Sequence, residues 1–308
     1  SIPALLEKYP NAIVLTNPKV AENIKNMLFV PEEKIQIIAD GEEISLGDKT
    51  LKFIFAPGVH WPDTMFTYIK EDNVIFTCDF LGAHYTFTDI FAPESKELEK
   101  SAKRYYAEIM MPFRMMCKKY TKMIKEMNVD MILPSHGPVH KNPNYILDLY
   151  TDWTSDTPKN LVALPYVSMY ESTKEMIDYL SNKLEAKGIK TFKFDIVDDD
   201  LGDLAMALVD AATIVMGTSM VLAGPHPMTV NVAYLAAVLR PKAKFASLLG
   251  SYGWGGKLFD LIAQILTPLK LDIIEPLQIK GKPKEEDFKK LDEMAETIYE
   301  KHKSIGII

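Results

Sequence analysis

The chain has 308 residues, which is enough for two domains that each bury a sizeable core. Its hydrophobic content of 47% and charged content of 25% are ordinary for a globular protein. The net charge of −7 argues against a nucleic acid or an anionic membrane as a partner, and no apolar run has membrane-spanning length. Two cysteines, Cys78 and Cys117, are too few for a disulfide scaffold and favour a reducing cytoplasm.

The first part of the chain predicts a β-meander and not a series of β-α-β units. A short strand is expected at residues 12–16, then a helix that starts with Asn17-Pro18 and runs to about residue 28. Turn signals separate the apolar runs that follow, which are residues 35–39, 43–46, 51–56, 64–70 and 74–79. This pattern fits one half of a sandwich in which two sheets are flanked by helices.

Three potential metal ligands follow the ends of predicted strands. His60 lies just beyond the strand at 51–56, Asp79 ends the run at 74–79, and His136 follows a short apolar strand at 131–134. Side chains at strand ends can converge on one metal or substrate. Imidazole and carboxylate ligands suit zinc, manganese or iron with open coordination positions. Each residue taken alone is equally typical of a turn or a solvated loop. His84 comes soon after Asp79, and we expect it to hydrogen-bond to the ligands.

A long helical stretch at residues 94–127 should break or kink at Pro112. A helix at 144–153 then closes the first domain, and the polar run at 154–160 marks a boundary. We therefore expect one domain at residues 1–157 and a second at residues 158–308.

The second domain alternates strand and helix. Strands are expected at 161–167, 190–196, 213–216, 244–249 and 271–279, and helices at 172–187, 201–210, 227–239, 256–266 and 285–303. Near-continuous apolar strands in this alternation predict a parallel sheet that is covered on both faces, with a ligand crevice at the carboxyl ends of the strands.

Three loops at that edge predict a site for a flat, phosphorylated ligand. The backbone amides at a helix start and nearby hydroxyls can hold a phosphate, glycines allow close approach, and aromatic rings can stack on the ligand. A carboxylate at Glu171 would repel a phosphate unless it points to solvent. The candidate residues are Ser168, Met169, Tyr170, Glu171, Ser172, Thr173, Thr218, Ser219, Met220, Leu222, Ala223, Gly224, Ser251, Tyr252, Gly253, Trp254 and Gly255.

The wording of these segments resembles the flavodiiron proteins over the whole chain. APGVHWPDTM, FTCDFLGAH and PSHGPVH resemble that family's later metal-binding segments, and SMYEST and GSYGW resemble its flavin loops. The resemblance implies an αββα metallo-β-lactamase-like domain followed by a flavodoxin-like doubly wound domain that binds FMN. It also implies two non-haem iron ions, with Asp79 as the bridging ligand and His60 and His136 each holding one iron.

One part of the family's pattern is missing. The first ligand cluster, a His-x-Glu-x-Asp-His motif, does not occur in these residues. We therefore expect a chain that has lost its N-terminal part, with a partial sandwich and about half of a two-metal ligand set. The alternative is a homologue that never had this cluster and no longer binds iron.

Membership in the family would imply a cytoplasmic reductase of dioxygen to water or of nitric oxide to nitrous oxide. The resemblance further implies a head-to-tail homodimer, or a tetramer built from it. Because no C-x-x-C module is present, the electron donor would be separate, either a rubredoxin or a reduced deazaflavin coenzyme. Two alternatives remain open: a zinc metallo-hydrolase fused to a flavodoxin module, and an FMN electron carrier without a working metal site.

Overall fold

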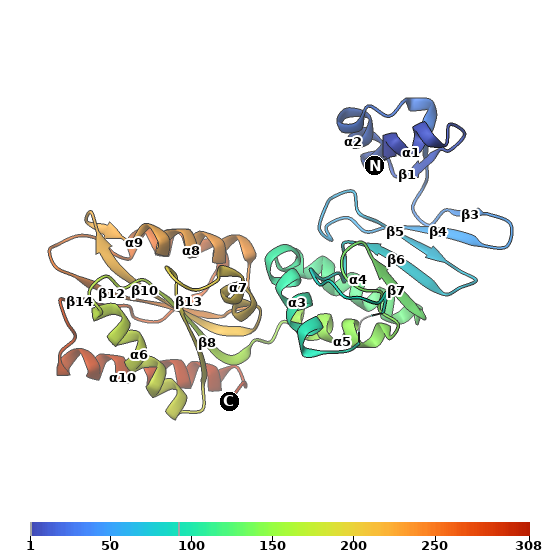
Figure 1. Cartoon of the computed structure of the whole chain (residues 1–308). Helices are drawn as coiled ribbons and strands as arrows, with labels where there is room; N and C mark the ends of the chain where they lie inside the picture. Colours follow the sequence, from blue (N-terminus) through green and yellow to red (C-terminus); the bar gives the residue numbers. More distant parts are fainter. Residues whose placement is uncertain (1, 92) are drawn as a thin grey trace. The chain divides into compact units, whose positions relative to one another are not determined.

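The computed structural model describes residues 2–91 and 93–308. The chain divides into two compact units, Ser1–Thr154 and Ser155–Ile308, and each unit has its own sheet (Figure 1). Among the described residues, no helix is long and apolar enough to cross a membrane.

The first unit starts with a small parallel pair of strands and two helices. Strand β1 (Val14–Thr16) pairs with β2 (Ile35–Ile37), and the helices are α1 (Ile2–Lys8) and α2 (Pro18–Leu28). The Asn17 side chain caps α2 by accepting a hydrogen bond from the backbone N–H of Val20, as the Asn-Pro sequence predicts.

A five-stranded sheet in the order β3-β4-β5-β6-β7 forms the centre of the first unit. The strands are β3 (Glu43–Ser45), β4 (Thr50–Phe55), β5 (Met65–Ile69), β6 (Val74–Cys78) and β7 (Met131–Pro134). All pairs are antiparallel except β6 with β7, which is parallel. The predicted meander is confirmed for β3 to β6, and β7 adds a parallel fifth strand from much later in the chain. The run at 35–39 was wrongly assigned to the meander, because β2 pairs in parallel with β1 across α2 as a β-α-β unit.

One face of this sheet is buried by aromatic packing. Phe66 of β5 stacks on Phe80 with ring centroids 5.9 Å apart and meets the ring of Tyr120 at 5.6 Å. Tyr120 comes from α4 (Arg114–Met127), and Tyr150, which contacts Phe80, comes from α5 (Pro143–Trp153). Large buried rings contribute much apolar area, so they fasten these two helices to the sheet.

The expected break at Pro112 is confirmed. Helix α3 (Lys96–Tyr105) runs into a π-helical turn (Tyr106–Met110) and a 3₁₀ turn (Met111–Phe113) before α4 begins. Proline has no N–H to donate and collides with the preceding turn, so the regular helix cannot continue through it.

The second unit is a parallel sheet in the order β13-β12-β10-β8-β9. Its strands are β8 (Lys159–Tyr166), β9 (Lys190–Asp195), β10 (Ala211–Val221), β12 (Phe245–Tyr252), β13 (Asp272–Ile273) and β14 (Leu277–Lys280), and a short strand β11 (Gly224–Pro225) forms a hairpin with β10. Numbered by sequence, this is the 2-1-3-4-5 order of the flavodoxin-like fold, which confirms the predicted doubly wound sheet.

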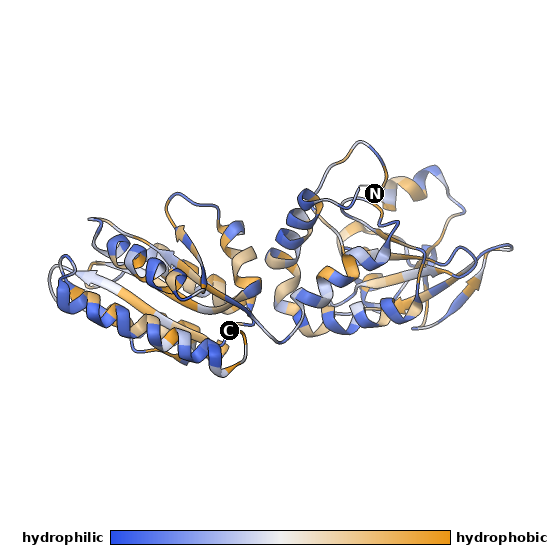
Figure 2. Cartoon of the chain, turned by 90° about the horizontal axis from the view of Figure 1, so that it is seen from below, coloured by the Kyte–Doolittle hydropathy of each residue, from blue (hydrophilic) through white to orange (hydrophobic). Residues whose placement is uncertain are grey.

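Helices cover both faces of this sheet. Helices α6 (Ser172–Ala186) and α10 (Glu285–Ser304) lie on one face, and α7 (Leu201–Asp210), α8 (Pro227–Leu239) and α9 (Asp260–Leu266) lie on the other (Figure 1). Figure 2 shows that α10 carries hydrophilic residues along one side and hydrophobic residues along the other. The buried core of this unit includes Val162, Leu164, Ile177, Leu249 and Ile298.

Three predicted elements of the second unit differ clearly from the structure. The strand expected at 213–216 is longer, because β10 runs from Ala211 to Val221. The strand expected at 271–279 is divided into β13 and β14, with Pro276 between them. Proline cannot donate to the ladder of hydrogen bonds, so it interrupts the strand. The helix expected from residue 256 begins only at Asp260, because residues 253–256 form a loop.

Candidate functional site

Three strand ends meet at one edge of the first unit's sheet. Strands β4 and β6 run in the same direction because both are antiparallel to β5, and β7 is parallel to β6. Asp79 directly follows β6, His136 lies two residues after β7, and His60 lies in the loop after β4. The structure therefore brings together the three residues that the sequence predicted.

The two histidines face different oxygens of the same carboxylate. The Nε2 atom of His60 is 3.3 Å from Oδ2 of Asp79, and the Nε2 atom of His136 is 3.3 Å from Oδ1. All three side chains are partly exposed, with the Asp79 side chain 23% exposed. Asp79 thus lies between two imidazoles at a position that solvent and small molecules can reach.

Backbone hydrogen bonds join the loops of Asp79 and His136. The N–H of Ser135 donates to the carbonyl of Cys78 at 2.7 Å, and the N–H of Ala83 donates to the carbonyl of His136 at 3.2 Å. A Cβ atom on Gly82 would lie 3.0 Å from the carbonyl oxygens of both Asp79 and His136, so a larger residue there would push the two loops apart by a few tenths of an ångström.

His84 and Tyr105 surround His136. The His84 ring is 5.7 Å from the His136 ring and 4.8 Å from the Tyr105 ring, both in edge-to-face geometry. Tyr105 is buried, and burial together with the nearby charge of Asp79 raises its pKa. The structure places the His84 ring in edge-to-face contact with His136, and the hydrogen bond expected from the sequence stays a prediction. Tyr105 belongs to α3, and its approach could not be inferred from sequence.

His140 is hydrogen-bonded to the loop that follows Asp79. Its buried Nε2 lies 2.9 Å from the carbonyl oxygen of Leu81, and burial lowers its pKa, so the neutral imidazole donates this hydrogen bond. The second histidine of PSHGPVH was the available signal for this role. Cys78, beside Asp79, has its thiol pKa raised, first by burial and then by the Asp79 charge.

The Asp79 carboxylate and the two imidazoles could serve a pair of metal ions that share the carboxylate. These residues alone would provide only part of the ligands that each ion needs. If two metal ions were bound there, each would receive one imidazole nitrogen and one carboxylate oxygen from this chain. Across residues 2–91 and 93–308, no group of three or more His, Cys, Asp and Glu side chains could hold one metal ion. Protein-bound first-row metals usually take at least three protein ligands, so these residues fit about half of a bridged pair.

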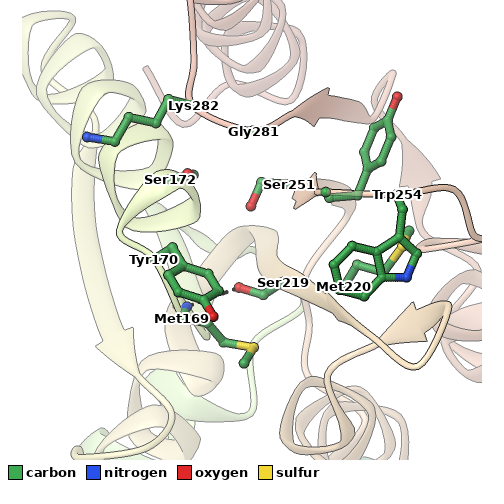
Figure 3. A pocket seen from close by; sticks show the side chains of 11 residues that line it. Met169, Tyr170, Ser172, Ser219, Met220, Ser251, Trp254, Gly281 and Lys282 are labelled. Atoms are coloured by element: carbon green, nitrogen blue, oxygen red, sulfur yellow. Dashed lines mark hydrogen bonds between the residues drawn. The ribbon is translucent and has the colours of Figure 1, made fainter.

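A second candidate site lies in the second unit, where the strand order reverses between β8 and β10. Open α/β sheets bind ligands at such a switch point, outside the carboxyl ends of the strands. A cavity of about 430 Å³ opens there and is lined by residues at the carboxyl ends of β10 and β12 and in the segments that follow β8, β12 and β14 (Figure 3). The lining residues are Met169, Tyr170, Ser172, Ser219, Met220, Ser251, Tyr252, Gly253, Trp254, Gly281 and Lys282.

The loop after β8 caps the start of α6 only in part. Glu171 precedes the helix in a left-handed conformation, with φ at 64°, and its own side chain does not cap the helix. The hydroxyl of Ser168 accepts a hydrogen bond from the N–H of Lys174 at 3.3 Å. The carboxylate of Glu171 is largely exposed and lies 3.3 Å from Nζ of Lys174, and this ion pair and solvent screen the charge that would repel a phosphate. The earlier amides of the first turn, at Ser172 and Thr173, suit an anion.

Some of the predicted hydroxyl groups line the cavity, and others form hydrogen bonds within the protein. Ser172, Ser219 and Ser251 line the cavity. Thr173 is fully buried, with its hydroxyl 3.3 Å from the carbonyl of Thr218 and 3.2 Å from the hydroxyl of Ser251, so it links the loops beneath the cavity. The predicted residues outside the cavity lining are Ser168, Glu171, Thr173, Thr218, Leu222, Ala223, Gly224 and Gly255.

The loops after β10 and β12 hold each other in place. The N–H of Lys257 donates to the carbonyl of Ala223 at 3.1 Å, and a Cβ on Gly256 would lie only 2.5 Å from that oxygen. Gly253 and Trp254 extend beyond this contact, and the Trp254 side chain is 78% exposed. The ring is therefore available to stack on a flat ligand. The sequence prediction missed Gly281 and Lys282, whose only signal was a Gly-Lys pair after the last strand.

The fold and the two sites define a class of protein in which a metallo-β-lactamase-like unit precedes a flavodoxin-like unit. A family model described as "ODP family beta lactamase" matches residues 1–137. An uncharacterized protein of Methanocaldococcus jannaschii is 32% identical over 95% of this chain and 76% of its own length. A nitric oxide reductase of Moorella thermoacetica is 30% identical over 97% of this chain and 76% of its own length.

Solved structures share the fold. The rubredoxin oxygen:oxidoreductase of Desulfovibrio gigas aligns with a TM-score of 0.93 at 24% identity, over 99% of this chain and 78% of that one. The flavodiiron protein of Giardia intestinalis aligns with a TM-score of 0.90 at 22% identity, over 97% of this chain and 75% of that one. The chain belongs to the flavodiiron protein family.

Proposed function

We propose that this protein is a cytoplasmic flavodiiron reductase of dioxygen, nitric oxide or both, which uses FMN and a non-haem di-iron site. The observation that carries the proposal is the placement of Asp79 between two imidazoles, each 3.3 Å from its own carboxylate oxygen, in a chain that also has a flavodoxin-type cavity. The names of the Moorella and Desulfovibrio relatives, a nitric oxide reductase and an oxygen oxidoreductase, support the choice of substrates.

In this proposal Asp79 would bridge two iron ions, with His60 on one and His136 on the other. The hydrogen bonds from Ser135 and Ala83 hold the two loops so that the carboxylate and the imidazole of His136 are already oriented. His84 packs its ring against His136 and restricts the orientation of that ligand.

The flavin would lie in the cavity of the second unit. Its phosphate would face the first-turn amides of α6 and the hydroxyl of Ser172, and its ring system would lie between the end of β10, which carries Ser219, and the loop that carries Trp254. When bound, FMN takes up two electrons and releases them singly, and an iron pair with open positions binds a small diatomic gas. The residues of this chain position the two groups.

The proposed partners follow from the family. A separate donor, either a rubredoxin or a reduced deazaflavin coenzyme, would deliver electrons to the flavin. A head-to-tail homodimer, or a tetramer of such dimers, would be the working assembly.

A second function, that of an FMN electron carrier, is favoured by one specific observation. The chain would supply two donors at each metal position, whereas the flavin cavity is lined by eleven residues from strand ends and loops of one unit. A chain that binds FMN but holds no iron would carry electrons and consume no gas.

The test measures iron and FMN bound per chain together with the consumption of dioxygen and nitric oxide under a chemical reductant. The proposal expects one FMN, bound iron that depends on Asp79, and uptake of at least one gas. FMN without iron, and with no uptake of either gas, would identify the electron carrier. Bound zinc with hydrolytic activity and no gas uptake would identify the metallo-hydrolase instead.

A further inference from the structure

Lys282 is the one cation among the eleven residues that line the cavity of the second unit. It lies just after β14, on the side of the cavity where α6 starts, and opposite Trp254 (Figure 3). We propose that Lys282 binds the phosphate group of the flavin nucleotide and makes the site prefer FMN to riboflavin. This inference rests on the proposed binding of FMN and adds the residue that recognises its charge.

The backbone fixes where Lys282 starts. Strand β14 pairs with β12 so that Ile279 lies opposite Ser251 and Lys280 opposite Tyr252. The N–H of Gly281 then donates to the carbonyl of Tyr252 at 2.9 Å, and Gly281 turns the chain with φ at 75°. The base of the Lys282 side chain is therefore held beside the cavity, one residue after the Gly281 contact with Tyr252.

The amine of Lys282 is free to bind a ligand. Within residues 2–91 and 93–308, no carboxylate forms an ion pair with Lys282, and the side chain is exposed. By contrast, Lys174 at the start of α6 is 3.3 Å from Glu171, and its charge is already balanced. A flexible lysine can move a compact positive charge onto a phosphate, which is a common use of this residue.

The arrangement also explains how a phosphate is tolerated beside Glu171. The start of α6 offers backbone amides and the Ser172 hydroxyl, which favour an anion but carry no full charge. With Glu171 and Lys174 balancing each other, Lys282 would supply the net positive charge at this end of the cavity. The ring end has no cation among its lining residues, so the charge acts on the phosphate and not on the flavin ring.

The experiment titrates the flavin-free full chain with FMN and with riboflavin and follows the quenching of flavin fluorescence at low and high salt. Lys282→Ala should weaken FMN binding about tenfold, as expected for loss of one charge-assisted contact, and should leave riboflavin binding unchanged. The salt dependence of FMN binding should decrease in this variant. Lys282→Arg should stay within about twofold of the original affinity, because it keeps the charge.

The matched control is Lys280→Ala, which removes the same charge two residues away from an exposed site outside the cavity lining. It should leave the affinity for both flavins unchanged. Equal weakening of FMN and riboflavin by Lys282→Ala, or no change in either, would overturn the inference while the FMN site stands. If the unsubstituted chain binds no FMN, the proposed function fails and this inference fails with it. Should Lys282→Ala unfold, Lys282→Gln replaces it in the same titration.

Discussion

The two candidate sites are assembled in different ways, although both lie at the carboxyl ends of strands. The candidate flavin cavity is built from strand ends and loops of one unit and is lined by backbone, hydroxyls and rings. The candidate metal centre depends on three side chains, in which two imidazoles face the two oxygens of the Asp79 carboxylate. A ligand held by many weak contacts keeps most of its affinity when one contact is lost. A metal ion held by two protein donors loses most of its affinity when one donor is removed.

Replacing the shared carboxylate should produce the largest effect. Asp79→Asn keeps the size of the side chain and removes the charge, so we expect iron affinity and gas consumption to fall on the order of 100-fold. FMN binding should stay unchanged, because the cavity belongs to the other unit. Iron titration and gas uptake provide the measurement.

The control for that change is Asp48→Asn, which alters an exposed turn of the same unit. It should leave iron, flavin and activity as they are. Retained iron binding in Asp79→Asn would show that the carboxylate is not shared between metals, and it would remove the contrast between the sites.

A change in the loops should affect the flavin site without touching a lining residue. The Cβ of Gly256→Ala would overlap the carbonyl oxygen of Ala223 at 2.5 Å. We expect the free energy of unfolding of the second unit to fall by about 2 kcal/mol and FMN to bind several-fold more weakly. Gly255→Ala is the matched control, because nothing lies within 4 Å of its Cβ. Equal effects of the two changes in a denaturant titration would contradict this explanation.

A smaller effect concerns the pH dependence of the unfolding free energy of the second unit. His302 is fully buried, with Nε2 2.7 Å from the Thr213 hydroxyl and Nδ1 2.8 Å from Oδ1 of Asn160, and burial lowers its pKa to about 4. Between that pKa and the ordinary value of 6.5, the unfolded chain binds a proton that the folded chain does not, so stability falls as the pH falls.

The expected loss between pH 7 and pH 5 is about 2 kcal/mol of unfolding free energy. His302→Gln cannot titrate and should reduce this pH dependence while it keeps polar atoms in place. Denaturant titration at both pH values, followed by a signal from the second unit, measures the difference. An unchanged pH dependence in His302→Gln would assign the acid sensitivity to other groups, such as His140 of the first unit, whose pKa burial also lowers.

Sequence reasoning identified most elements of both sheets because apolar periodicity and turn residues are local signals. The strand order of the second unit needed the resemblance, since pairing between strands is not local. The helix α1, which has no buried residue, and the hairpin strand β11 were not predicted. The late start of α9 follows from the close approach of Gly256 to Ala223, a contact between distant segments that no local pattern shows.

The candidate metal site was predicted in outline only. Strand ends indicated that His60, Asp79 and His136 could converge, but not that each imidazole would take its own carboxylate oxygen. Tyr105 and His140 were missed because a helix and a bridge to β7 bring them there. Lys282 was missed for a similar reason, since the pairing of β14 with β12 decides its position.

The backbone bonds around Asp79 have a consequence for motion. The loops of Asp79 and His136 are joined by two main-chain hydrogen bonds, so they should move together. In the described part of the chain, the loop of His60 meets Asp79 through side chains alone, while its Asp63 is bonded to Asn17 and Asn23 of the α2 region. A displacement of α2 would therefore be passed through Asp63 to the loop of His60, whereas Asp79 and His136 would keep their positions relative to each other.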